Sequence, residues 1–127
     1  LGPLSPGDQA EWEASGRSFV VLAGLGWRLL LDSIDAARRL VPPDQWLDVR
    51  LEDLMEAPRE TTGRVLDFLG LDWTPEFDAG FRLHTFQASR GLAWKRDLGD
   101  EQAALLESVI ARPLSTYGYP LLHSTVH

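Results

Sequence analysis

The chain has 127 residues, contains no cysteine, and carries 12 basic against 19 acidic side chains, for a formal net charge of −7. This acidic balance argues against general nucleic-acid binding, which needs a basic surface, and the absence of cysteine excludes a disulfide framework, thiol catalysis and cysteine-ligated zinc. The longest apolar run, residues 19–27, is too short to cross a bilayer and follows no positively charged leader, so we expect a cytoplasmic protein with no membrane segment.

The N-terminal residues predict an arm followed by a short helix. Residues 1–6 are typical of a turn. Ser5 before Pro6 is a common helix start, because the serine hydroxyl caps a backbone N–H and proline needs no donor at the first helical position. Ser15 and Gly16 are expected to interrupt this helix.

A long amphipathic helix is predicted next. Between Arg17 and about Leu40, apolar residues recur at helical spacing while charged residues fill the opposite side. Gly24 and Gly26 each cost about 1 kcal/mol relative to alanine in such a helix. They are compatible with a helix, a loop or a close crossing of two helices. The two prolines at 42–43 end the element.

Apolar and polar residues alternate from Leu47 to Leu51, which is the period of two expected of a strand with one dry face, and we predict a strand over Trp46 to Leu51. Glu52 and Asp53 end this alternation and predict an acidic turn. They are candidates for paired catalytic carboxylates. Carboxylates at such a junction more often cap backbone N–H groups or hold a nearby arginine, and we expect that structural role here.

A helix is predicted from Pro58 to Gly70. Proline suits the first helical position, and Val65, Phe68 and Leu69 recur at three- and four-residue steps. Gly70 offers the left-handed conformation that commonly closes a helix. The sequence therefore predicts that this apolar stripe faces a core.

The C-terminal third predicts two more helices. Thr74 as the cap and Pro75 at the first position begin a short helix, and residues 82–96 show no strong period, so we expect them to be mostly irregular. A last helix begins near Asp100, and Pro113 is expected to stop it. Residues 120–127 are expected to form a tail. With no repeat and no low-complexity linker, residues 1–127 are expected to form a single unit.

Positive charge gathers in one segment of this acidic chain. Residues 79–96 contain no aspartate or glutamate. The cations of this segment, which we call the cationic island, are Arg82, Arg90, Lys95 and Arg96, with His84 beside them. Two interpretations stay open: an anion-binding loop, or a solvated loop that balances the acidic helices.

The centre of the island has the residue types that bind anions. Ser89 supplies a hydroxyl, Arg90 a guanidinium able to hold a phosphate with two bonds, and Gly91 lets backbone N–H groups approach closely. Lys95 adds a point charge beside the flat ring of Trp94. The three histidines, in contrast, show no metal-ligand spacing, and no metal site is expected.

Several ordered pieces of the sequence together resemble a known family. They are V-R-L-E-D-L at 49–54, A-P at 57–58, V-L-D-F-L-G-L at 65–71, W-K-R-D-L at 94–98 and Y-G-Y at 117–119. This order is similar to the C-terminal part of sulfotransferases that use PAPS (3′-phosphoadenosine 5′-phosphosulfate). Leu51 stands where members of that family often carry tyrosine.

The resemblance implies an α/β, P-loop-like sulfotransferase fold, of which this chain is the C-terminal, mostly helical portion with one parallel strand at 46–51. It also implies transfer of a sulfuryl group from PAPS to a hydroxyl or amine of a small-molecule acceptor. In that family an Arg/Gly-containing loop before a Trp-Lys pair covers the 3′-phosphate. By position, this implicates Arg90 and Gly91, with Lys95 and Ser89, in cofactor binding.

Other parts of such an enzyme are missing from these residues. The resemblance places the phosphosulfate-binding loop, P-x-x-G-T-T in type, and the catalytic groups in an N-terminal half, and no such sequence occurs here. We therefore expect the remainder of the sulfotransferase domain as a partner and no catalytic residue in this chain. The alternative is a non-catalytic helical interaction module. An unpaired strand edge favours the sulfotransferase, and a folded, stable chain with no exposed apolar patch favours the module.

Overall fold

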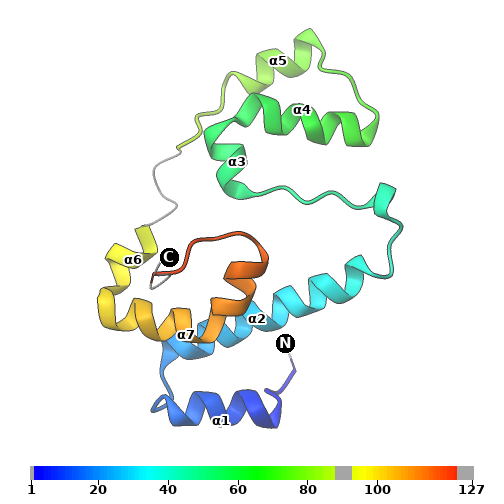
Figure 1. The fold of residues 1–127 in the computed structure, drawn as a ribbon. Helices are drawn as coiled ribbons and strands as arrows, with labels where there is room; N and C mark the ends of the chain where they lie inside the picture. Colours follow the sequence, from blue (N-terminus) through cyan, green and yellow to red (C-terminus); the bar gives the residue numbers. More distant parts are fainter. Residues whose placement is uncertain (1, 88–92, 123–127) are drawn as a thin grey trace, which may run out of the picture. The chain divides into compact units, whose positions relative to one another are not determined.

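The computed structural model describes residues 2–87 and 93–122, and every regular element in this part of the chain is a helix (Figure 1). The elements are, in order, α1 (Pro6–Ala14), α2 (Phe19–Arg38), the 3-10 helix η1 (Pro43–Gln45), α3 (Leu51–Glu56), α4 (Pro58–Leu69), α5 (Pro75–Phe81), α6 (Ala93–Leu98) and α7 (Asp100–Thr116). Two compact units divide the chain: unit 1 comprises Leu1–Leu40 and Trp94–His127, and unit 2 comprises Val41–Ala93. That residues 1–127 belong to one sulfotransferase domain stays a prediction.

The first helix of unit 1 begins and ends where the sequence predicts. The Ser5 hydroxyl accepts a hydrogen bond from the Asp8 backbone N–H at 3.1 Å, and Pro6 is the first helical residue. After α1 the chain turns at Gly16 and Arg17, which have φ angles of 72° and 61°. A left-handed turn of this kind cannot continue a helix, so the interruption predicted at Ser15 and Gly16 is confirmed.

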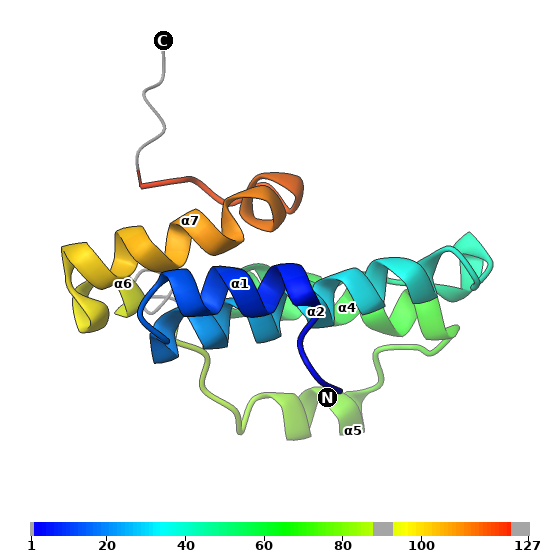
Figure 2. The same ribbon diagram turned by 90° about the horizontal axis from the view of Figure 1, so that it is seen from below.

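The core of unit 1 forms where α2 and α7 pack against each other (Figure 2). A Cβ atom on Gly24 would lie 2.9 Å from Cδ1 of Leu106 and 3.2 Å from Cγ1 of Val109. Of the interpretations offered for the glycines, Gly24 therefore marks a close helix crossing within an unbroken α2. The buried apolar residues at this crossing are Val21 and Leu25 from α2, and Val109, Ile110 and Leu114 from α7.

Helix α7 does not stop at Pro113, and that prediction is wrong. The helix continues to Thr116 with the proline inside it. A proline within a helix leaves the carbonyl four residues earlier without its usual donor. Here that carbonyl belongs to Val109, and Nη1 of Arg28 donates to it at 3.2 Å. A side chain from α2 thus replaces the missing backbone hydrogen bond.

The strand predicted from Trp46 to Leu51 is not present in the part of the chain that the structure describes. The backbone is extended, with φ and ψ of −126° and 127° at Trp46 and −82° and 136° at Arg50, but residues 46–50 form no regular element and Leu51 begins α3. A strand needs a neighbouring strand for its hydrogen-bond ladder. Residues 2–87 and 93–122 supply none.

Unit 2 is built on α3 packed against α4. The hydroxyl of Thr61, a buried residue of α4, donates to the Asp53 carbonyl at 2.9 Å. Helix α4 begins at Pro58 and closes at Gly70, whose φ is 69°, as predicted. However, Phe68 and Leu69 are 39% and 58% exposed, so the stripe predicted to face a core lies open in unit 2.

The remaining elements agree in part with the sequence. Helix α5 begins at Pro75 with Thr74 as its cap, whose hydroxyl accepts from the Phe77 N–H at 3.2 Å. The prediction that residues 82–96 are mostly irregular is wrong at their end, because α6 starts at Ala93. With six residues, α6 is too short to show an apolar period in the sequence.

Candidate functional site

Most of the predicted cofactor-binding loop lies outside the described residues. Ser89, Arg90 and Gly91 are in this gap. Lys95 is described: it lies in α6, and its ammonium nitrogen is 5.6 Å from the centroid of the Trp94 ring. Within residues 2–87 and 93–122, no carboxylate pairs with Lys95.

The other described cations of the island have carboxylate partners. Nε of Arg82 lies 2.7 Å from Oδ2 of Asp78, and Nε of Arg96 lies 3.6 Å from Oδ1 of Asp97. Arg82 and His84 belong to unit 2, whereas Lys95 and Arg96 belong to unit 1. Among the described cations of the island, Lys95 is therefore the one without a carboxylate partner.

Asp78 is the centre of a charged and aromatic cluster in unit 2. It accepts hydrogen bonds from Trp73 Nε1 at 2.9 Å and Arg59 Nη1 at 2.7 Å, in addition to its pairing with Arg82. These donors, the Trp73 N–H first and then Arg59, hold the pKa of Asp78 below its ordinary value. The Arg59 guanidinium also lies over the rings of Trp73 and Phe81, at 4.7 and 5.5 Å. Because Arg82 pairs with Asp78, it is part of this cluster and has a structural role.

This cluster makes the stability of unit 2 depend on pH. Because the pKa of Asp78 is lowered in the folded chain, its contribution is present above the ordinary carboxyl pKa and is lost as pH falls through the lowered value. We expect Asp78→Asn to reduce the loss of stability on acidification, measured by urea unfolding followed by tryptophan fluorescence. Asp67→Asn, an exposed carboxylate on α4, is the control, and an equal effect of both changes would contradict the assignment.

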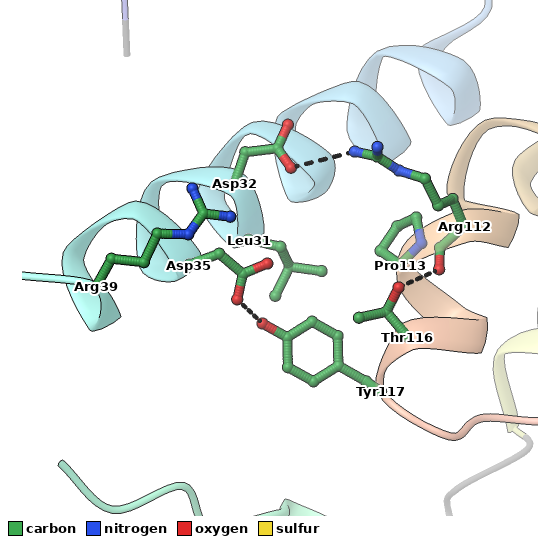
Figure 3. A pocket seen from close by; sticks show the side chains of 8 residues that line it. All are labelled: Leu31, Asp32, Asp35, Arg39, Arg112, Pro113, Thr116 and Tyr117. Atoms are coloured by element: carbon green, nitrogen blue, oxygen red, sulfur yellow. Dashed lines mark hydrogen bonds and ion pairs between the residues drawn. The ribbon is translucent and has the colours of Figure 1, made fainter. Parts of the chain in front are cut away.

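A polar pocket of about 420 Å³ lies between the C-terminal halves of α2 and α7 in unit 1 (Figure 3). The Tyr117 hydroxyl donates to Oδ1 of Asp35 at 2.8 Å, and Nη2 of Arg112 lies 3.6 Å from Oδ1 of Asp32. The hydrogen bond to Asp35 is the main cause of a raised pKa at Tyr117. The pocket is lined by Leu31, Asp32, Asp35, Arg39, Arg112, Pro113, Thr116 and Tyr117.

The sequence did not reveal this pocket. Asp32, Asp35 and Arg39 follow a spacing of three and four residues, which places them on one face of α2. That face has the composition of an ordinary solvated helix surface. What makes it a pocket is Tyr117, 82 residues further along the chain from Asp35, and no local pattern indicates that α7 meets this face.

An apolar groove of about 410 Å³ lies in unit 2 between the extended segment and α4. It combines the alternating residues of the predicted strand with the open stripe of α4. The lining residues are Gln45, Trp46, Leu47, Val49, Val65, Phe68 and Leu69. Apolar residues of the alternating segment thus line a groove that is open to solvent in unit 2, although the strand is absent from the described residues.

Comparison with known proteins gives one match. The sequence model of a family described as "Sulfotransferase family" matches residues 8–75, just over half of the chain. The matched range begins within α1, includes α2 to α4 with the extended segment, and ends at the first residue of α5, before the cationic island. Neither curated proteins nor solved structures give a match. Among the helices that the structure describes, none is both long and apolar enough to cross a membrane.

Proposed function

The chain belongs to the sulfotransferase family, a family of transferases, and from this premise we propose that it forms part of a PAPS-dependent sulfotransferase. The reaction is the in-line transfer of a sulfuryl group from the phosphosulfate of PAPS to a hydroxyl or amine of a small-molecule acceptor. The sulfur–oxygen bond to the donor phosphate breaks as the bond to the acceptor forms, and the acceptor proton passes to a base outside this chain. The family match is the observation that supports this proposal.

In this proposal the chain provides the wall of the cofactor site on the 3′-phosphate side. Arg90 holds two phosphate oxygens, Gly91 and Ser89 offer N–H and hydroxyl donors, and Lys95 adds a single charge. The availability of Lys95 supports the assignment, because Arg82 and Arg96 have carboxylate partners and Lys95 has none within the described range. The Trp94 ring beside Lys95 offers a flat apolar surface.

We further propose that the remainder of the sulfotransferase domain covers the apolar groove of unit 2. Val49 is 41% exposed, and Phe68 and Leu69 are open as well. Full burial of an exposed apolar side chain stabilises by about 1.5–3 kcal/mol, and these partly covered side chains would gain a part of that value. A neighbouring strand would also complete the ladder that the extended backbone at 46–50 lacks within the described residues, giving the P-loop-like fold. The exposed groove favours this function over an isolated interaction module.

The test is the binding of adenosine 3′,5′-bisphosphate to the complete protein by isothermal titration calorimetry. We expect binding, and we expect Arg90→Ala to weaken it by about 10- to 100-fold, because a charged hydrogen bond contributes roughly 1.5–3 kcal/mol. Arg96→Ala is the matched control, since Arg96 already lies beside Asp97. No binding to the unmodified protein contradicts the use of PAPS, and unchanged affinity in Arg90→Ala contradicts the site.

A further inference from the structure

The polar pocket of unit 1 is lined by two arginines, Arg39 and Arg112, as well as by two aspartates. Within the described part of the chain, the Arg39 side chain has no hydrogen bond or ion pair, and the pairing of Arg112 with Asp32 is 3.6 Å long, beyond hydrogen-bond distance. Two guanidinium groups therefore border the pocket, and neither makes a side-chain hydrogen bond within the described residues (Figure 3). They suit an anionic group that accepts several hydrogen bonds.

The same pocket contains negative potential from two sources. Asp32 and Asp35 line it from α2. The pocket also lies at the last turns of α2 and α7, which end at Arg38 and Thr116, and the C-terminal end of a helix carries a partial negative charge. An ammonium group is favoured beside these carboxylates, and a purely anionic ligand is not.

The donors and acceptors of the lining are held in fixed positions. The Tyr117 hydroxyl donates to Asp35 at 2.8 Å, and the Thr116 hydroxyl donates to the Arg112 carbonyl at 2.9 Å. Both oxygens can still accept a hydrogen bond from a ligand. A volume of about 420 Å³ lies within the range of small-molecule sites.

We propose that this pocket binds a small zwitterion that carries a primary ammonium and a phosphate-like anionic group. The ammonium lies beside Asp32 and Asp35, and the anionic group lies against Arg39 and Arg112. The lining residues other than Leu31 and Pro113 offer polar groups, so charge and hydrogen bonding provide the recognition. The site belongs to unit 1 alone, so this inference stands whether or not the chain uses PAPS.

The experiment is calorimetric titration of the chain with three probes: O-phosphoethanolamine, inorganic phosphate and ethanolamine. We expect phosphoethanolamine to bind at least about tenfold more tightly than either of the other two, because it alone satisfies both charges. Phosphate binding as tightly as phosphoethanolamine would assign a simple anion site and overturn the proposal. Equally tight ethanolamine binding, or no binding of phosphoethanolamine, would overturn it too.

Variants then locate the binding. Arg39→Gln and Asp32→Asn are each expected to weaken phosphoethanolamine binding by about tenfold or more. Arg96→Gln and Asp97→Asn make the same two chemical changes outside the pocket, at two exposed residues of unit 1 whose charged atoms are 3.6 Å apart. They are expected to leave binding unchanged. Circular dichroism confirms that each variant is folded. If the two control variants weaken binding as much as the two pocket variants do, the ligand binds outside this pocket.

Discussion

Replacing Arg28 by methionine is expected to lower the free energy of unfolding of unit 1 by about 2–4 kcal/mol. The Arg28 guanidinium joins three helices: it donates to Asp8 at 2.6 Å, to Glu11 at 2.8 Å and to the Val109 carbonyl at 3.2 Å. Its side chain is only 22% exposed, and that of Asp8 is 15% exposed. Methionine keeps the apolar length but leaves two carboxylates and one carbonyl without this donor.

Urea unfolding followed by circular dichroism measures this loss, and Arg112→Met is the control. The side chain of Arg112 is 82% exposed and 3.6 Å from its carboxylate, and such surface pairs contribute about 0–1 kcal/mol. Similar losses for the two variants would contradict a special role for Arg28.

A double-mutant cycle with Pro113 separates the contribution of the hydrogen bond from Arg28 to the Val109 carbonyl from that of the ion pairs of Arg28 with Asp8 and Glu11. Pro113→Ala returns a backbone N–H to the Val109 carbonyl, so this carbonyl no longer depends on Arg28. We expect Arg28→Met to be less damaging when alanine occupies position 113, with a coupling energy of about 1 kcal/mol. Strict additivity would show that Arg28 stabilises through Asp8 and Glu11 alone.

The helix ends that were predicted correctly depend on local chemistry. Ser5 and Thr74 accept backbone N–H groups within the next three residues, and Gly70 adopts the left-handed conformation that closes α4. Each of these interactions involves residues a few positions apart, so the sequence contains the whole cause. Pro113 failed as a stop signal because the group that compensates for it, Arg28, lies 81 residues from the carbonyl it serves.

The strand at Trp46 was predicted from alternating apolar and polar residues, and this pattern alone does not establish a strand. Alternation of apolar and polar residues shows that one face of an extended segment is dry. It does not supply the neighbouring strand that forms the ladder. The structure has the extended backbone, and apolar residues of this segment line an open groove with Val65 and Phe68. The α3 helix after it was missed because it starts within the alternating segment, at Leu51.

The two candidate sites also differ in whether the sequence alone could reveal them. The cationic island was visible in the sequence because its charges are neighbours along the chain, although the structure shows that Arg82 belongs to the Asp78 cluster. The polar pocket was not visible, because it needs α2 and α7 together. Residue types thus indicated where charge gathers, and the tertiary pairing of helices decides which charges are available to a ligand.

The second large effect is expected at the helix crossing of unit 1. Gly24→Val places side-chain atoms where an added Cβ alone would lie 2.9 Å from Leu106 and 3.2 Å from Val109. The Val109 contact is with a branched, buried side chain of low freedom, so α2 and α7 must separate. Overpacking of this kind costs about 1–3 kcal/mol, and we expect a value near the upper end from thermal or urea unfolding.

Gly26→Val is the matched control, because it makes the same change two residues later in the same helix. Apart from its chain neighbours and the nearby backbone of α2 itself, no described atom lies within 4 Å of a Cβ at Gly26. Valine also has a better helix propensity than glycine, by a few tenths of a kcal/mol, so this variant is expected to be neutral or slightly more stable. A loss of stability at Gly24 without a loss at Gly26, in the same helix, follows from contact with α7 and not from helix propensity. Equal losses at both positions would therefore contradict the close crossing on which unit 1 depends.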